Sequence, residues 1–121
     1  MVETFSIPSP YKWDSSFDVK HDELNGQHQK LFELIADLEK DQSNGTKLKN
    51  LLDMVVLHFK TEEEIQTKKG LLSDEHKEKH ENLLKDCANV KHVDQGVIDF
   101  LKGWLVRHIK GSDIPDYGGR V

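Results

Sequence analysis

Four stretches of this sequence repeat apolar residues at helical spacing, and short turn signals separate them. The stretches cover residues 17–40, 46–70, 74–89 and 95–111. In the first stretch, Leu24, Leu31, Ile35 and Leu38 follow at steps of seven, four and three residues, which places them on one helical face. No useful run of alternating β-branched residues indicates a strand. We therefore expect an all-α fold, an antiparallel up-down-up-down four-helix bundle.

Turn and capping residues predict where the four helices begin and end. The turn before the second helix ends at Thr46, whose hydroxyl is a suitable N-cap. Gly70 is a good residue to end that helix, and Ser73 and Asp94 precede the third and fourth helices as caps. We expect the fourth helix to end at Gly111 because proline and glycine follow it.

Length and charge limit the class of protein. The 121 residues fit one domain, with an irregular N-terminal arm at 1–16, the bundle at 17–111 and a tail at 112–121. A formal charge of −5 argues against nucleic acid as a partner. The apolar runs are too short to span a membrane or to form a signal peptide, and the single cysteine, Cys87, forms no internal disulfide. We therefore expect a cytoplasmic protein.

Five of the seven histidines fall on the apolar stripes. They are His28, His58, His76, His80 and His108. A single histidine in such a position is most often a hydrogen-bonded core residue, but burying five of them beside Glu62 would cost a small core too much free energy. A bound metal removes this difficulty. The other two histidines, His21 and His92, are expected near the end of the bundle and in solvent.

The helix directions bring these histidines to one layer of the bundle. The set lies early in the first and third helices and late in the second and fourth, and those ends meet when neighbours are antiparallel. Carboxylates should complete the set, because five neutral imidazoles leave a buried metal charge uncompensated. Glu62 is one of them, whereas Glu63 and Glu64 should face solvent. Asp113 can turn back toward His108 only if the helix ends first, at Gly111.

The combined pattern resembles the hemerythrin family over nearly the whole chain. The matching motifs are His28, His58-Phe59-x-x-Glu62, His76-x-x-x-His80 and His108-x-x-x-x-Asp113. Shorter phrases such as Gln27-His28-x-x-Leu31-Phe32 and Trp104-Leu105-Val106-x-His108 support the resemblance. It implies a single hemerythrin-like domain over residues 1–121.

The resemblance also implies a pair of iron ions joined by an oxo or hydroxo bridge. One iron would be held by His76, His80 and His108 and the other by His28 and His58, with Glu62 and Asp113 bridging both. Such a set leaves one open position, on the two-histidine iron, and dioxygen binds there in the family. The family's apolar pocket corresponds to Leu105, Leu31, Phe32 and Phe59, with Trp104 beside them, and packing in the core is the alternative role for these residues. The family usually has a tyrosine three residues after the bridging aspartate, but here Tyr117 comes four residues after Asp113, so the resemblance does not place it beside the site.

Three functions are compatible with this reading. The leading one is reversible dioxygen binding for storage, transport or delivery, without enzymatic turnover. A di-iron oxidase or peroxidase is an alternative, but such sites use Glu-x-x-His pairs, and no glutamate lies three residues before any of the seven histidines. An iron-sensing, oxygen-sensing or metal-buffering protein is a further alternative. The sequence leaves open whether the chain is a monomer or a homo-oligomer.

Overall fold

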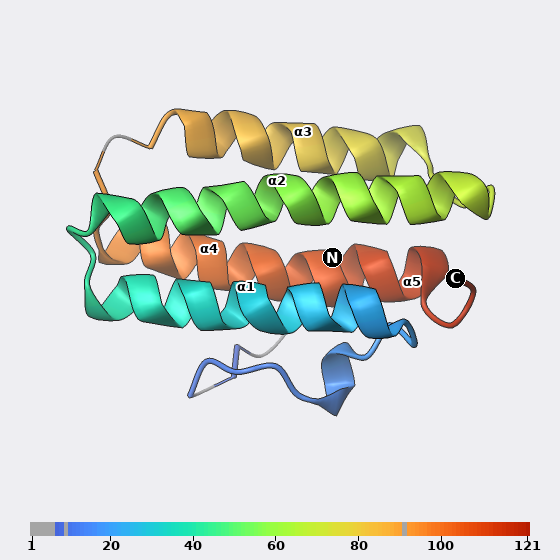
Figure 1. Ribbon diagram of the computed structural model, residues 1–121, viewed down its shortest axis with the longest axis horizontal. Coiled ribbons are helices and arrows are strands. Elements are labelled where there is room, and N and C mark those ends of the chain that lie inside the picture. Colours follow the sequence, from blue (N-terminus) through green and yellow to red (C-terminus); the bar gives the residue numbers. More distant parts are fainter. Residues whose placement is uncertain (1–6, 9, 91) are drawn as a thin grey trace, which may run out of the picture.

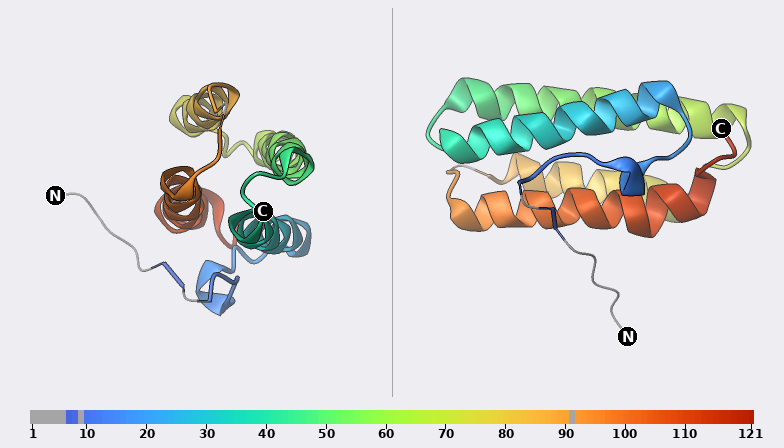
Figure 2. Two further views of the ribbon diagram at one scale, coloured as in Figure 1. Left: turned by 90° about the vertical axis from the view of Figure 1, so that its left-hand side faces the viewer. Right: turned by 90° about the horizontal axis from the view of Figure 1, so that it is seen from below.

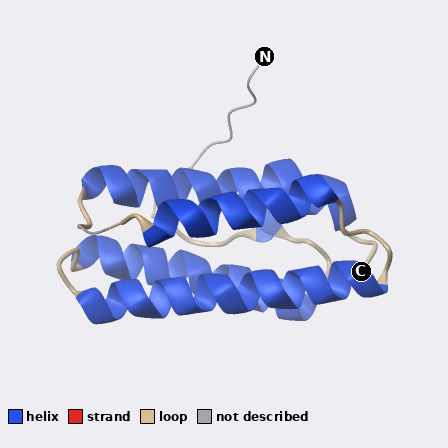
Figure 3. Cartoon of the chain, turned by 90° about the horizontal axis from the view of Figure 1, so that it is seen from above, coloured by secondary structure: helices blue, strands red, loops and turns tan. Residues whose placement is uncertain are grey.

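The described residues fold into four long helices that run alternately in opposite directions (Figure 1). This computed structural model describes residues 7–8, 10–90 and 92–121. The helices are α1 (Asp22–Lys40), α2 (Gly45–Lys68), α3 (Asp74–Ala88) and α4 (Gln95–His108). Viewed end-on they occupy the corners of a square, and no strand occurs in the described residues (Figures 2 and 3). The predicted all-α four-helix bundle is confirmed. None of the described helices combines the length and apolar character needed to cross a membrane.

The predicted apolar stripes form the core between these helices. Leu24, Leu31, Ile35 and Leu38 of α1 are all buried. They pack with buried residues of the other three helices, namely Leu51, Val55, Phe59, Leu83, Ile98, Leu101 and Leu105. Helical periodicity therefore identified the buried face of each segment.

The first helix begins later than the predicted residue 17. Ser15–Phe17 form a separate 3₁₀ turn, η1, and α1 starts at Asp22 with His21 as its N-cap. The imidazole Nδ1 of His21 accepts a hydrogen bond from the backbone N–H of Leu24 at 3.3 Å. Lys20 has a φ of 62°, in the left-handed region, so the helix cannot extend backward through it. His21 thus has a capping role that periodicity alone does not reveal.

Capping residues set the remaining helix starts. Ser73 and Asp94 cap α3 and α4 as predicted, and Gly70, with a φ of 68°, follows the end of α2. The cap of α2 is Asn44, whose side chain accepts from the backbone N–H of Lys47 at 3.1 Å, so the expectation of Thr46 was wrong. Asn44 is an equally good cap and lies two residues earlier.

The described part of the N-terminal arm lies along α1 and α4 (Figure 2). Tyr11 is buried, its ring lies 4.7 Å from that of Phe32, and its hydroxyl donates to the backbone carbonyl of Lys102 at 2.9 Å. Phe17 also packs against Phe32, with ring centroids 4.8 Å apart. The arm is therefore fixed to the bundle by aromatic contacts. Residues 1–6 and 9 of the predicted arm lie outside the described residues.

The last helix does not end at Gly111 as predicted. A π-helical turn, η2 (Ile109–Asp113), continues directly from α4 and leads into the short α5 (Ile114–Tyr117). Its hydrogen bonds are spaced by five residues, as in the bond from the N–H of Ile114 to the carbonyl of Ile109. Pro115 is tolerated because it occupies the first turn of α5, where a missing N–H costs little.

Candidate metal centre

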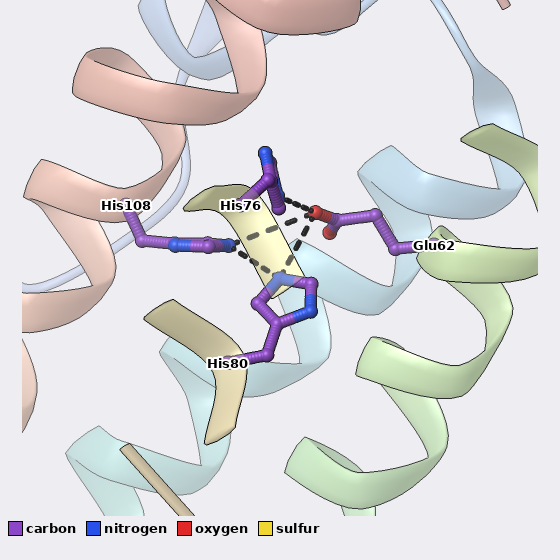
Figure 4. Close-up of side chains that lie close together, drawn as sticks. All are labelled: Glu62, His76, His80 and His108. Atoms are coloured by element: carbon purple, nitrogen blue, oxygen red, sulfur yellow. Dashed lines mark hydrogen bonds and ion pairs between the residues drawn. The ribbon is translucent and has the colours of Figure 1, made fainter. Parts of the chain in front are cut away.

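Three histidines converge on one carboxylate at the first of two clusters. Figure 4 shows His76 and His80 from α3 and His108 from α4 pointing at Glu62 of α2. We call these residues the three-histidine cluster. The Nε2 atoms of His76, His80 and His108 lie 2.7, 3.3 and 3.6 Å from Oε1 of Glu62, and those of His80 and His108 lie 3.1 Å apart. Two imidazole nitrogens that bind one ion at right angles, each at about 2.1 Å, lie about 3.0 Å apart.

The second cluster lies on the other side of the same carboxylate. It comprises His28 of α1, His58 of α2, Glu62 and Asp113, and we call it the two-histidine cluster. The Nε2 atoms of His28 and His58 lie 3.1 Å apart. His58 Nε2 is 2.8 Å from Oε2 of Glu62, and His28 Nε2 is 3.2 Å from Oδ2 of Asp113. The donor atoms of each cluster lie within 4.8 Å of one another, so either group could hold a metal ion.

The two carboxylates each turn one oxygen toward each cluster. Glu62 presents Oε1 to the three-histidine cluster and Oε2 to the two-histidine cluster. Asp113 presents Oδ1 to His108 at 3.1 Å and Oδ2 to His28. This is the arrangement required of a carboxylate that bridges two ions. Apart from the cluster histidines that face them, Glu62 Oε2 and both oxygens of Asp113 have no hydrogen-bond partner in the described part of the chain, so no other group competes with a metal for them.

All seven of these side chains are buried, and their charges compensate one another. Burial lowers the pKa of His76 and of His108, but contacts with Asp113 and Glu62 outweigh it and raise the pKa values to about 10 and about 9. The pKa of His58 is lowered, because burial there outweighs the attraction of Glu62. Burial raises the pKa of both carboxyl groups, but the surrounding histidines outweigh it, so both pKa values are lowered. In the absence of metal, protonated histidines therefore neutralise the two carboxylates.

Residues outside the clusters fix the histidine rings through their outer nitrogens. His76 Nδ1 lies 2.8 Å from Oδ2 of Asp116, and His80 Nδ1 lies 3.0 Å from Oε2 of Glu63. A carboxylate can only accept, so Nδ1 carries the hydrogen, and Nε2 is the nitrogen that binds a metal once its own proton is released. The expectation that Glu63 simply faces solvent was wrong, because α3 packs beside it and supplies His80. Glu64 is exposed as expected.

The third such contact involves Gln27, the residue before His28. Its Oε1 lies 2.8 Å from Nδ1 of His58, and its Nε2 donates to Oγ1 of Thr61 at 3.2 Å. Sequence reasoning missed the roles of Gln27 and Asp116. The sequence held a weak signal for Gln27, because it lies next to the buried face of α1 and such residues face the neighbouring helix α2. Nothing in the sequence singled out Asp116.

Tyr117 packs beside the centre, although the sequence did not place it there. The residue is fully buried, and its ring lies 6.2 Å from that of His76. A step of four residues within a helix keeps Tyr117 on the same side as Asp113, one turn further on. Burial raises the pKa of its hydroxyl, and the charges of Asp113 and Glu62 raise it further, so Tyr117 stays protonated. The hydroxyl has no hydrogen-bond partner among the described residues.

The five residues predicted to line an apolar pocket occupy different places. Phe59 stacks on His80 with ring centroids 3.9 Å apart, and Trp104 stacks on His108 at 4.8 Å. Both therefore lie against the three-histidine cluster. Phe32 packs with the aromatic residues of the arm, as described above. Leu31 and Leu105 are each 1% exposed and belong to the core between the helices.

The remaining histidines and the cysteine lie away from the two clusters. His21 caps α1, and His92 is exposed between α3 and α4, as expected. Cys87 is a buried free thiol, and burial raises its pKa. These residues contribute no ligand to either cluster.

A four-helix bundle that buries five histidines around two shared carboxylates belongs to the class of dinuclear metal proteins. The family described as the hemerythrin HHE cation binding domain matches residues 19–113. The chain belongs to the hemerythrin family, whose domain binds a di-iron centre and dioxygen.

Similar proteins span almost the full length of this chain. A hemerythrin-like protein of Naegleria gruberi is 50% identical over 114 residues, which cover 93% of this chain and 96% of that protein. Myohemerythrin-1 of Phascolopsis gouldii is 39% identical over 119 residues, covering 97% and 99%. Myohemerythrin of Riftia pachyptila is 36% identical over 117 residues, covering 95% and 98%.

Proposed function

We propose that this chain binds dioxygen reversibly at a di-iron centre, for storage, transport or delivery. His76, His80 and His108 would hold one iron and His28 and His58 the other, with Glu62 and Asp113 bridging the pair. The proposal rests on one observation: three histidines lie on one side of the shared carboxylates and two lie on the other side. It gives the two metal positions different numbers of protein ligands.

The count of donors leaves room for one small ligand. Three imidazoles and two carboxylate oxygens surround one position, whereas two imidazoles and two carboxylate oxygens surround the other. With one further bridging oxygen, the first position reaches six ligands and the second reaches five. When bound, the iron pair supplies the electrons for reversible dioxygen binding at the remaining place. Imidazole and carboxylate donors fit iron well.

The chain itself would keep water away from this place. Leu31 and Leu105 are buried, and we propose that they contact the ligand and exclude solvent. The protonated hydroxyl of Tyr117, which lacks a partner, is a hydrogen-bond donor held beside the bridging carboxylates. Dry surroundings favour release of dioxygen over oxidation of the centre.

The small number of carboxylates favours a carrier over an oxidase. Ferritin-like oxidases direct about four carboxylates into the bundle. Glu62 and Asp113 are the buried acidic residues in the described part of this chain. A histidine-rich set suits reversible binding, and we propose no substrate turnover. A cytoplasmic location stays a prediction from the sequence.

The test is metal analysis combined with absorption spectra over cycles of oxygenation and removal of oxygen. We expect two irons per chain and a charge-transfer band that disappears under vacuum and returns with oxygen over repeated cycles. A band that never returns, with oxidised iron after one cycle, would favour an oxidase or a sensor. A single zinc ion per chain would contradict the proposal outright.

A further inference from the structure

The two clusters differ in the charge of the groups that hold their outer nitrogens. In the three-histidine cluster, His76 and His80 donate to the carboxylates of Asp116 and Glu63, at 2.8 and 3.0 Å. In the two-histidine cluster, His58 bonds to the neutral amide of Gln27 at 2.8 Å. The Nδ1 atom of His28 has no hydrogen-bond partner in the described part of the chain.

This difference alters how strongly each cluster binds a metal ion. An imidazole that donates its N–H to a carboxylate becomes more basic at the opposite nitrogen, and its ring is held in the orientation that the metal requires. A neutral amide orients the ring but adds no negative charge. The three-histidine cluster also has one more imidazole donor. Ligand number and outer charge therefore both favour it.

We propose that Glu63 and Asp116 are positioning residues that make the three-histidine position the tighter of the two. Metal then leaves the two-histidine position first and returns to it last. This inference rests on the proposed function only in that the two clusters are metal-binding positions. It concerns the unequal strength of the two positions and does not depend on dioxygen.

The exposure of the two carboxylates sets the size of the expected effect. Loss of an outer partner of a metal-bound histidine costs about 10- to 100-fold in metal affinity. The side chains of Glu63 and Asp116 are 27% and 39% exposed, so water screens part of their charge. We therefore expect about a 10-fold loss for each residue, at the lower end of that range.

The experiment loads the full chain with cobalt(II) and removes the metal with increasing chelator. Visible absorption reports the coordination of the bound cobalt, and metal content reports its amount. We expect two steps of removal, with the second at higher chelator concentration. His58→Gln should abolish the first step and retain the second, because it removes a ligand from the two-histidine position alone. Loss of the second step instead would overturn the proposed order.

Conservative variants then test the role of charge. Glu63→Gln and Asp116→Asn keep a hydrogen-bond acceptor and remove one negative charge. Each should move the second step to about 10-fold lower chelator and leave the first step unchanged. Glu64→Gln is the matched control, because it makes the same charge change next to Glu63 on an exposed side chain. It should move neither step.

Tighter metal binding at the two-histidine position would distinguish an effect of charge from a merely structural role. Gln27→Glu places a carboxylate against His58 and should move the first step to higher chelator. Damage to the fold would weaken both steps and could not produce this gain.

Equal behaviour of the Glu63, Asp116 and Glu64 variants would contradict the inference and leave the proposed function intact. A chain that holds one cobalt, sensitive to Asp116→Asn, would support the inference and contradict the di-iron proposal. A chain that holds none would contradict both.

Discussion

His108 and Asp113 lie on the same side of one continuous helix, with Nε2 and Oδ1 3.1 Å apart. A step of five residues in an α-helix would turn Asp113 by about 140° away from His108. The π-helical turn η2 reduces this offset, because its hydrogen bonds join residues five apart and each turn therefore takes more residues than a turn of α-helix. The backbone therefore delivers a ligand histidine and a carboxylate to the same point without ending the helix.

Asp113→Asn should lower the pKa of His108 in the metal-free chain from about 9 toward the ordinary value of 6.5. The negative charge of Asp113 is the main influence that opposes the effect of burial there. The amide keeps the shape of the side chain and removes that charge. Titration of the His108 ring by NMR measures the shift. A value that stays near 9 in the variant would show that Glu62 alone sustains it.

Glu62→Gln should reduce the metal content of the protein from two ions per chain. Glu62 is fully buried and presents an oxygen to each cluster, so the neutral amide weakens both positions together. Metal analysis after purification measures the loss. Glu64→Gln, on the exposed side of α2, should retain two ions. A Glu62→Gln protein that still holds two ions would count against a bridging role.

The sequence was sufficient to predict the four helices and the positions of the five histidines. Both follow from the 3.6-residue period, which places His28 on the same face as Leu24 and Leu31 and also determines which face is buried. The pairing of clusters came from the family resemblance, and the donor distances agree with it. Local spacing and the expected burial of the apolar face were therefore enough to bring most of the site residues together in the prediction.

Contacts between distant segments were beyond prediction from local spacing. The hydrogen bond of Glu63 depends on α3, because its partner His80 lies on that helix, 17 residues away in the sequence. The π-helical turn was missed because Gly111 is a common helix end, and no residue preference distinguishes an end from a widened turn. The start of α1 depended on the side chain of His21 acting as a cap, a role that serine or asparagine usually fills.

The metal-free chain should lose stability as the pH rises above 6.5. His76 and His108 have folded-state pKa values of about 10 and about 9, against 6.5 in the unfolded chain. Their contribution is fully present below pH 6.5 and is lost progressively up to pH 9 to 10. Urea unfolding in the presence of chelator, between pH 6 and 9, measures the fall. His108→Gln should show a smaller decrease over this range, and a free energy of unfolding that rises with pH would contradict the argument.

Lowering the pH should destabilise the metal-free chain through the opposite pair of groups. The pKa values of Glu62 and Asp113 are lowered in the folded state. Their contribution is therefore present above their ordinary values of 4.5 and 3.8 and is lost as the pH falls below them. The same urea experiment at pH 5, 4 and 3 should show the free energy of unfolding decreasing, and Asp113→Asn should reduce that decrease.

Tyr117→Phe should leave the stability of the metal-free chain within about 1 kcal/mol of the parent. The hydroxyl is buried and has no partner among the described residues, so its removal breaks no hydrogen bond. Thermal unfolding of both proteins, with and without metal, measures the effect. A loss of stability that appears only in the loaded protein would show that the hydroxyl donates to the metal centre. A large loss in the metal-free protein would contradict the observed lack of a partner.

Leu105→Ala should speed the oxidation of the iron centre, and Leu101→Ala should not. Both leucines are buried in α4, and each substitution leaves a cavity that costs about 2–5 kcal/mol of stability. The two variants remove the same atoms from buried positions of one helix, but Leu105 lies one turn before His108 and Leu101 lies two turns before it. A cavity beside the centre admits water to the bound ligand, whereas a cavity further along the helix does not. The rate at which the oxygenated absorption band decays at constant temperature distinguishes them. Equal rates in the two variants would show that Leu105 contributes only to packing.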